Sequence, residues 1–256
     1  MSRNRQSSIA NTCTMTGFPP TRISVVEALR NEDYEVRERA MDLLAATYWK
    51  PVYTYIRLKW KADPQSAEDL TQDFFARSIE RDFFAQYDPG RARFRTWLRV
   101  GIDRLVANAL ESANRQKRGG GARAVPLDAA EFERDIATRS PGPLPDDDEL
   151  FRREVARALF SHAVAALHAE CEANGKAVPW KVFHAYDIEG PDQDAKPSYG
   201  ALAAEHGVPV TQVTNYLAAM RKRFRALVLD RLRELSASDA EFRAEARDVL
   251  GVDVGT

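Results

Sequence analysis

The chain has 256 residues, 44% of them hydrophobic, which is enough for two ordinary domains that each bury an apolar core. Its two cysteines, Cys13 and Cys171, lie far apart and form no Cys/His cluster, so neither a disulfide framework nor a structural zinc site is indicated. No apolar run approaches the roughly 20 residues that a membrane span requires, and the N-terminus lacks the apolar core of a signal peptide. These features predict a cytoplasmic protein without a membrane partner.

The net charge of −1 conceals a strong segregation of charge along the chain. Nine basic residues stand against two acidic ones over 91–123, and six basic residues stand against one acidic residue over 211–233. Between them, over 126–150, eight acidic residues stand against two basic ones. Basic blocks of this kind are the electrostatic footprint of nucleic-acid binding.

The first half of the chain predicts a tail and a helical domain. Residues 1–20 show no hydrophobic period and are expected to be a disordered tail. From residue 21 to 120 we expect helices. Apolar residues recur at three- and four-residue spacing from Asp33, and Pro51 is expected to open a second helix on the same apolar face.

Two further helices complete this first domain. Asp63-Pro64 supplies a cap followed by proline at the first helical position, which predicts a helix that runs to about Glu80. The turn sequence from Tyr87 to Gly90 precedes a long amphipathic helix, which the glycines at 119–121 end.

The second half predicts a linker and more helices. Residues 121–148 form an acidic, proline-rich linker, and 149–237 a second helical domain. Within it we expect helices from Glu149 to about Asn174, Val178 to Ile188, Ser198 to His206 and Val210 to Leu235. Residues 238–256 add a short helix, with Ser238 and Glu241 as its capping box, and a tail. No strand pattern appears, so the predicted fold class is all-α.

The segment from Ser198 to Leu229 predicts a helix-turn-helix around Gly207. Its second helix would expose polar side chains that suit base edges in a major groove, and basic side chains that reach phosphates. These candidates for duplex DNA binding are Thr211, Gln212, Thr214, Asn215, Arg221, Arg223 and Arg225. The alternative is a helical hairpin with a solvated basic face.

The first basic block interleaves aromatic residues with arginines, a mixture that suits single-stranded or opening DNA. Stacking on an aromatic face is worth roughly 1 to 3 kcal/mol per base. The alternative is that Phe94 and Trp97 are core residues on the apolar stripe of their helix, and one residue can also serve both roles.

Two motifs resemble a known family. The run Ala67-Glu68-Asp69-Leu70-Thr71-Gln72-Asp73-Phe74-Phe75, followed by the run from Tyr87 to Leu98, resembles region 2 of bacterial RNA polymerase sigma factors, closest to the extracytoplasmic-function type. The helix-turn-helix resembles region 4 of the same family. The resemblance covers roughly Asp33 to Leu235. Ala201, Tyr216 and Ala219 depart from the residues that are frequent in the family, so the bases read at −35 are not predicted.

The resemblance implies two helical domains, a region 2-like bundle and a region 4-like helix-turn-helix, joined by the acidic linker. It implies a non-catalytic subunit without cofactors that binds core RNA polymerase and promoter DNA, and it leaves an anti-sigma factor open as a further partner. Asp69, Gln72 and Asp73 would dock on a coiled coil of the largest polymerase subunit. The helix-turn-helix would read the −35 element. The residues that would read and open the −10 element are Arg91, Arg93, Phe94, Arg95, Trp97, Arg104, Asn108, Arg115, Lys117 and Arg118.

Two other classes of function are weighed against this one. A stand-alone helix-turn-helix regulator would bind duplex DNA without polymerase. An RNA-modifying enzyme or nuclease would depend on residues such as Asp69, Asp73 or His184, but the four histidines are scattered without metal-ligand spacing. We therefore expect no enzymatic activity.

Overall fold

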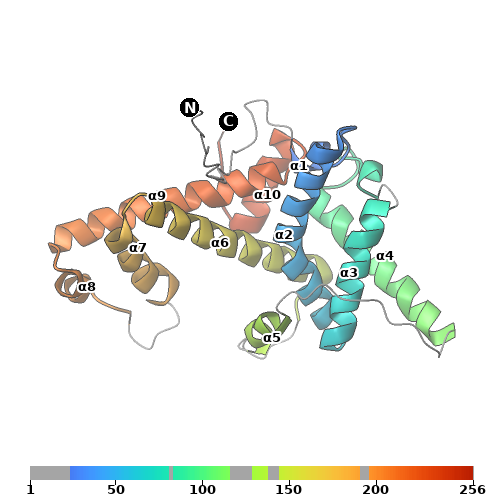
Figure 1. Ribbon diagram of the computed structural model, residues 1–256, viewed down its shortest axis with the longest axis horizontal. Coiled ribbons are helices and arrows are strands. Elements are labelled where there is room, and N and C mark those ends of the chain that lie inside the picture. The colour runs from blue at the N-terminus through green and yellow to red at the C-terminus, as the bar shows by residue number, and fades with distance from the viewer. Residues whose placement is uncertain (1–23, 81–82, 116–128, 138–143, 191–195, 256) are drawn as a thin grey trace, which may run out of the picture.

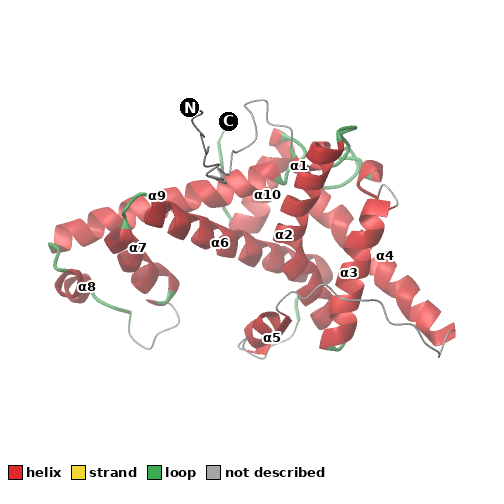
Figure 2. Ribbon diagram, viewed as in Figure 1, coloured by secondary structure: helices red, strands yellow, loops and turns green. Residues whose placement is uncertain are grey.

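The computed structural model describes residues 24–80, 83–115, 129–137, 144–190 and 196–255. Over these residues it contains helices and loops but no strand, which confirms the predicted all-α fold (Figures 1 and 2). The predicted N-terminal tail lies outside the described residues. The elements in chain order are α1 (Val25–Ala28), α2 (Tyr34–Lys59), α3 (Pro64–Glu80), the short 3-10 helix η1 (Phe83–Gln86), α4 (Phe94–Arg115), α5 (Ala129–Ala137), α6 (Asp147–Ala173), α7 (Ala177–Phe183), the π-helical turn η2 (His184–Ile188), α8 (Tyr199–His206), α9 (Val210–Glu234) and α10 (Asp239–Leu250).

Helix α2 is continuous through Pro51, so the prediction that this proline starts a second helix is wrong. Proline in a helix interior removes one backbone hydrogen bond and costs about 3 kcal/mol. The helix nevertheless continues because a single apolar stripe with four-residue spacing, Leu44, Tyr48, Val52 and Ile56, is almost completely buried on both sides of it. Burying each of these side chains contributes about 1.5 to 3 kcal/mol, which offsets the lost bond.

Helix α3 begins where the sequence predicts. The Asp63 carboxylate accepts a hydrogen bond from the Ser66 amide (3.1 Å) and another from the Ser66 hydroxyl (2.6 Å), so it caps the first turn. Beyond η1, α4 packs so closely on Phe83 that a Cβ atom at Gly101 would lie 2.3 Å from the Phe83 ring. Only glycine fits at that position of α4.

Two apolar cores are joined by the long helices α6 and α9, which lie side by side in Figure 1. The first core combines residues of α1 to α4 with Phe151 and Leu159 of α6 and with residues of α9 and α10. The second core combines Leu167 and Cys171, further along α6, with residues of α7, α8 and the first half of α9. The predicted domain boundaries stay a prediction, but the apolar core of 21–120 continues into three helices beyond them.

The helix-turn-helix forms with the predicted packing. Ser198 caps α8 by accepting a hydrogen bond from the Ala201 amide (3.1 Å), and Gly207 ends the helix with φ 63° in the left-handed region. Leu202, Val213 and Leu217 are buried in the second core.

The predicted linker contains a helix that the sequence analysis missed. Glu133 of α5 accepts two hydrogen bonds from the Arg57 guanidinium (2.6 and 2.7 Å) and one from the Tyr53 hydroxyl (2.7 Å), and Phe132 packs beside Tyr53. These hydrogen bonds hold the pKa of Glu133 below its usual value, although partial burial opposes them. Residues 121–128 and 138–143 of the predicted linker lie outside the described residues.

We predict that Glu133→Gln loosens α5 on α2. The pKa of Glu133 is lower in the folded chain than in the unfolded one, so its contribution is complete above a pH of 4.5, its ordinary pKa, and is lost as the pH falls through the lowered value. We expect amide hydrogen exchange of α5 to speed up by about tenfold in the variant, because the carboxylate accepts charge-assisted hydrogen bonds.

Glu35→Gln is the matched control. Its ion pair with Arg39 is exposed, with 81% of the Glu35 side chain and 65% of the Arg39 side chain accessible, so the exchange of α5 should not change. Equal exchange in Glu133→Gln and the wild-type chain would show that this carboxylate does not hold α5.

Candidate nucleic-acid interface

The loop between η1 and α4 is anchored on its inner side and exposed on its outer side. The Tyr87 hydroxyl donates a hydrogen bond to the Ala92 carbonyl (3.0 Å), and the Gly90 amide donates one to the Asp88 carboxylate (2.9 Å). Tyr87 is buried, whereas Asp88, Gly90 and Arg91 are exposed. Burial raises the pKa of the Tyr87 hydroxyl, and the nearby charge of Glu241 raises it further. The loop therefore presents a turn to solvent from a fixed base.

The aromatic residues of this region form a cluster among themselves. Phe94 is 1% exposed and lies edge-on to Tyr87, with 5.3 Å between the ring centroids. Trp97 is partly exposed and stacks on Phe83 at 4.1 Å. Phe94 is thus a core residue, as one alternative held, and the partly exposed Trp97 is the aromatic residue of this pair that solvent reaches.

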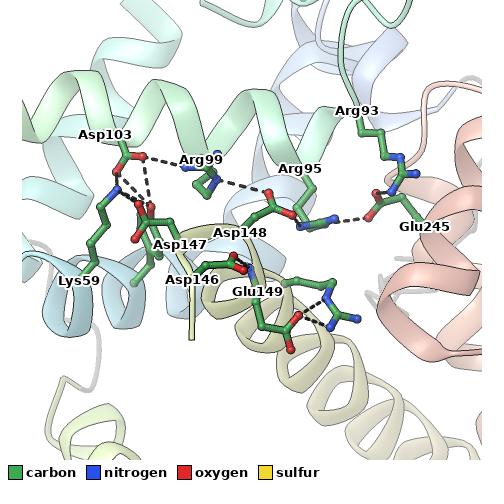
Figure 3. Close-up of polar contacts among 12 residues, drawn as sticks. Lys59, Arg93, Arg95, Arg99, Asp103, Asp146, Asp147, Asp148, Glu149 and Glu245 are labelled. Atoms are coloured by element: carbon green, nitrogen blue, oxygen red, sulfur yellow. Dashed lines mark hydrogen bonds and ion pairs between the residues drawn. The ribbon is translucent and has the colours of Figure 1, made fainter. Parts of the chain in front are cut away.

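Arg95 is buried and paired with acidic side chains from distant segments. Its Nε donates a hydrogen bond to Glu245 of α10 (3.0 Å), its Nη1 lies 3.3 Å from Asp148 of α6, and the Arg95 and Glu245 side chains are only 3% and 6% exposed. Figure 3 shows Arg95 between these two carboxylates. Burial lowers the pKa of Arg95, but the charge of Glu245 and its hydrogen bond outweigh burial, so the net shift is upward. The guanidinium is held charged inside the protein.

The other cations at the start of α4 are paired in the same way. Arg93 forms an ion pair with Asp248 of α10, and Arg99 lies 3.0 Å from Asp103 and 3.4 Å from Asp148. Lys59 of α2 links Asp103 (2.8 Å) to Asp147 at the start of α6 (2.7 Å). The acidic end of the predicted linker is therefore held against the basic block by alternating charges (Figure 3).

The rest of the predicted −10 set is distributed unevenly. Arg91 is exposed and lies 3.2 Å from Asp88, and Arg104 and Asn108 are exposed further along α4. The backbone of Arg115 ends the helix. Lys117 and Arg118 lie outside the described residues, as does the Arg115 side chain. Among the described members of this set, Arg91, Arg104 and Asn108 are exposed, and Arg93 and Trp97 are partly exposed.

Three acidic residues of α10 contact the start of α4 and were not predicted as site residues from the sequence. Glu241, Glu245 and Asp248 share one helix face and contact Phe94, Arg95 and Arg93. Their spacing of four and three residues was the available signal. The predicted capping box forms only in half: Ser238 accepts from the Glu241 amide (3.1 Å), but the Glu241 carboxylate accepts from the Ala237 amide (2.7 Å) and from α4. Part of the predicted box thus became a contact between distant helices.

The start of α9 presents the predicted polar residues to solvent. Thr211, Thr214 and Asn215 are exposed, and Gln212 is half-buried. The Thr214 hydroxyl donates a hydrogen bond to the Val210 carbonyl (3.3 Å) and can still accept one, and all three exposed side chains can reach base edges.

The basic residues that follow on α9 differ in their surroundings. Arg221 makes two hydrogen bonds to Asp187 (2.8 and 2.9 Å), and Arg223 makes two to Glu170. Among the described residues no ion pair is found for the exposed Arg225. Arg221 and Arg223 must therefore exchange a protein carboxylate for any phosphate, whereas Arg225 does not.

The predicted polymerase-docking residues lie on one face of α3. Asp69 is exposed and accepts a hydrogen bond from Gln65 (3.0 Å), Asp73 accepts one from Arg77 (2.6 Å), and Gln72 is half-buried. His184, named with the two aspartates for an enzymatic alternative, belongs to η2 beyond α7, and Figure 1 shows α3 and α7 toward opposite ends of the molecule. The structure does not bring those three residues together.

The described residues lack two structural features. They contain no group of three or more His, Cys, Asp or Glu side chains that could hold a metal ion. They also include no helix that is both long and apolar enough to cross a membrane.

We predict that Glu245→Ala lowers the free energy of unfolding by about 3 kcal/mol, because it leaves the buried Arg95 with only the partly exposed Asp148. The double variant Arg95→Met, Glu245→Leu should recover most of that loss, since apolar side chains of similar volume can replace a buried ion pair. Urea unfolding measures both changes.

Asp253→Ala serves as the matched control, because its ion pair with Arg247 is highly exposed, and it should change the free energy by less than about 1 kcal/mol. A loss in Glu245→Ala as small as in this control would show that the buried pair does not stabilise the fold.

Comparison with known proteins identifies the segment that contains most of these residues. Residues 44–116 match the family model of sigma-70 region 2, and this match runs from the middle of α2 past the end of α4. No curated protein and no solved structure matches the chain significantly. Residues 44–116 are thus similar to sigma-70 region 2, and the rest of the chain lies outside this match.

Proposed function

We propose that this protein is a sigma factor of the extracytoplasmic-function type. It binds core RNA polymerase, directs it to specific promoters through their −10 and −35 elements, and assists strand opening as a non-catalytic subunit in the cytoplasm. The observation that carries the proposal is that one chain combines the region 2 match with a separate helix-turn-helix whose reading helix exposes Thr211, Thr214 and Asn215. An anti-sigma factor is a further partner that this function allows.

The −10 element is assigned to the loop before α4 and to the exposed side of that helix. Arg91, Arg104 and Asn108 are exposed there, and Trp97 offers a partly exposed ring. Exposed arginines can hold the DNA backbone while an unstacked base packs on an aromatic ring. The buried Arg95 and the partly exposed Arg93 are both paired with carboxylates of α10, and they support this surface by fixing the start of α4.

The −35 element is assigned to the first turns of α9, with phosphate contacts from its basic residues. In this assignment, one end of the elongated molecule recognises duplex DNA and the other end assists strand opening (Figure 1). The acidic face of α3, with Asp69 and Asp73, is assigned to polymerase docking, because carboxylates one helical turn apart suit arginines of a partner helix.

One reconstitution experiment tests the function. The purified chain is added to core RNA polymerase together with a library of random promoters, and transcripts are sequenced. We expect initiation at a restricted set of promoters that share two sequence elements. Absence of promoter-specific initiation, with a shift of a palindromic operator by the protein alone, would instead identify a stand-alone regulator.

We predict that Asp69→Arg with Asp73→Arg weakens binding to core polymerase by about tenfold or more, since both charges change sign at a proposed interface. The variant should fold as the wild type does, because Asp69 is exposed and Asp73 faces solvent beside Arg77. Fluorescence anisotropy with labelled chain measures the affinity. Glu35→Arg with Glu38→Arg on the exposed first turns of α2 is the control, and equal affinities in both double variants would remove α3 from the interface.

We also predict an order among the basic residues of α9. Each phosphate contact contributes about 0.9 to the slope of log affinity against log salt concentration. Arg225→Ala should lower the slope by nearly that amount, whereas Arg221→Ala should lower it less, because Arg221 gives up its Asp187 partner when it binds a phosphate. Binding of duplex −35 DNA at several salt concentrations gives the slopes, and the reverse order would contradict the ion pairing.

A further inference from the structure

We infer that the C-terminal helix α10 contributes to the proposed opening of the −10 element, and that its residue Glu241 positions the loop before α4 and the start of that helix. This inference rests on the proposed function. It assigns a role to a segment that lies outside the region 2 match and more than a hundred residues beyond it.

The contacts of Glu241 converge on the loop and helix that would open DNA. Its Oε1 atom accepts a hydrogen bond from the Phe94 amide (2.6 Å) and lies 3.2 Å from the Tyr87 hydroxyl, whose single proton it shares with the Ala92 carbonyl. Its Oε2 atom accepts from the Ala237 amide (2.7 Å), which fixes the carboxylate relative to its own helix. One side chain thus joins both ends of the exposed loop from Tyr87 to Phe94.

Helix α4 needs such a partner because its own sequence supplies no cap. The first amides of a helix have no acceptor within the helix, and the residue before Phe94 is an arginine, whose side chain can only donate. A carboxylate at this end is also favoured by the helix dipole. Glu241, 147 positions along the chain, fills the place that a local Ser, Thr or Asp occupies in other helices.

The support behind Glu241 is rigid. Phe242, Ala246 and Val249 of α10 are buried in the first core, and Glu245, one turn further along α10, holds the buried Arg95 of α4. The carboxylate of Glu241 is therefore held in place before DNA arrives, as a positioning group must be.

The exposed side of the loop indicates that α10 positions the loop and does not block DNA from reaching it. Glu241 contacts a backbone amide and a tyrosine hydroxyl on the inner side of the loop, whereas Asp88, Gly90 and Arg91 on the outer side stay exposed. A helix that blocked DNA would cover that outer side. Here α10 leaves the turn open and fixes its base.

The first measurement uses the free chain. In Glu241→Ala we expect the amides of the first turn of α4 to exchange at least about tenfold faster, because they lose a charged cap. Glu241→Gln keeps the Oε1 acceptor for α4, although its NH2 group cannot accept from the Ala237 amide as Oε2 does, and exchange in the first turn of α4 should stay within about threefold of the wild type. Asp239→Ala, which changes an exposed acid of the same helix, is the control. Unchanged exchange in Glu241→Ala would overturn the inference.

The second measurement uses holoenzyme made with the same variants, on a promoter that carries 2-aminopurine in its −10 element. For Glu241→Ala we expect the equilibrium constant for strand opening to fall about tenfold, with affinity for core polymerase and for duplex −35 DNA unchanged. Glu241→Gln should restore most of the opening. Rescue by the glutamine and selectivity for the opening step distinguish positioning from general destabilisation.

The remaining outcomes overturn the inference in distinct ways. If Glu241→Ala opens the promoter better than the wild type, α10 blocks DNA rather than positioning the loop. If the affinity for core polymerase falls as much as the opening, Glu241 only stabilises the fold. If even wild-type holoenzyme opens no promoter, the proposed function fails and this inference fails with it, whatever the exchange experiment shows.

Discussion

The buried ion pair between Arg95 and Glu245 is the constraint around which the first half of the molecule is built. A guanidinium that is 3% exposed requires a charged partner, because an unpaired buried charge costs several kcal/mol. The partner comes from the last helix, so α10 must fold back onto α4. That position in turn buries Phe242 and Val249 in the first core and brings Glu241 to the Phe94 amide. The C-terminal segment consequently packs on the helices that the region 2 match covers, although it lies outside the match.

The frame formed by α6 and α9 links the two proposed DNA contacts. Each of these helices contributes to both apolar cores, with Phe151 and Leu167 of α6 in different cores, and Phe224 of α9 packing against both. The helix-turn-helix is therefore connected to the −10 region through packed helices in this structure. For the proposed function this means that their separation is set by helix packing as well as by the loops between them.

Helix ends and turns, which depend on residues close together in the sequence, were predicted well. Ion pairs between residues far apart in the sequence were not. Asp63-Pro64 and Gly207 mark helix ends through their own side chain or backbone, so the start of α3 and the turn before α9 were predictable. Pro51 was misread because its local cost is overcome by burial of residues that pack on other helices. The arginines of α4 were assigned to DNA from their charge, and nothing near them in sequence indicates that Arg95 faces inward. The acidic stripe of α10 was a signal that could have suggested it, since carboxylates on a single helix face can pair with cations from a distant segment.

The acidic and basic segments of the chain contact each other through these ion pairs. The acidic residues Asp147 and Asp148 begin α6, where the helix dipole favours negative charge, and the same carboxylates contact Lys59, Arg95 and Arg99. The basic block is thereby divided into an inner set neutralised by the protein and an outer set, with Arg91 and Arg104, that faces solvent. In the proposed function a nucleic acid would meet mainly the outer set. In this way a protein with almost no net charge can keep basic residues on its surface, while its other arginines are paired with carboxylates. These inner pairs also hold the start of α4, and with it the basic surface, in one orientation.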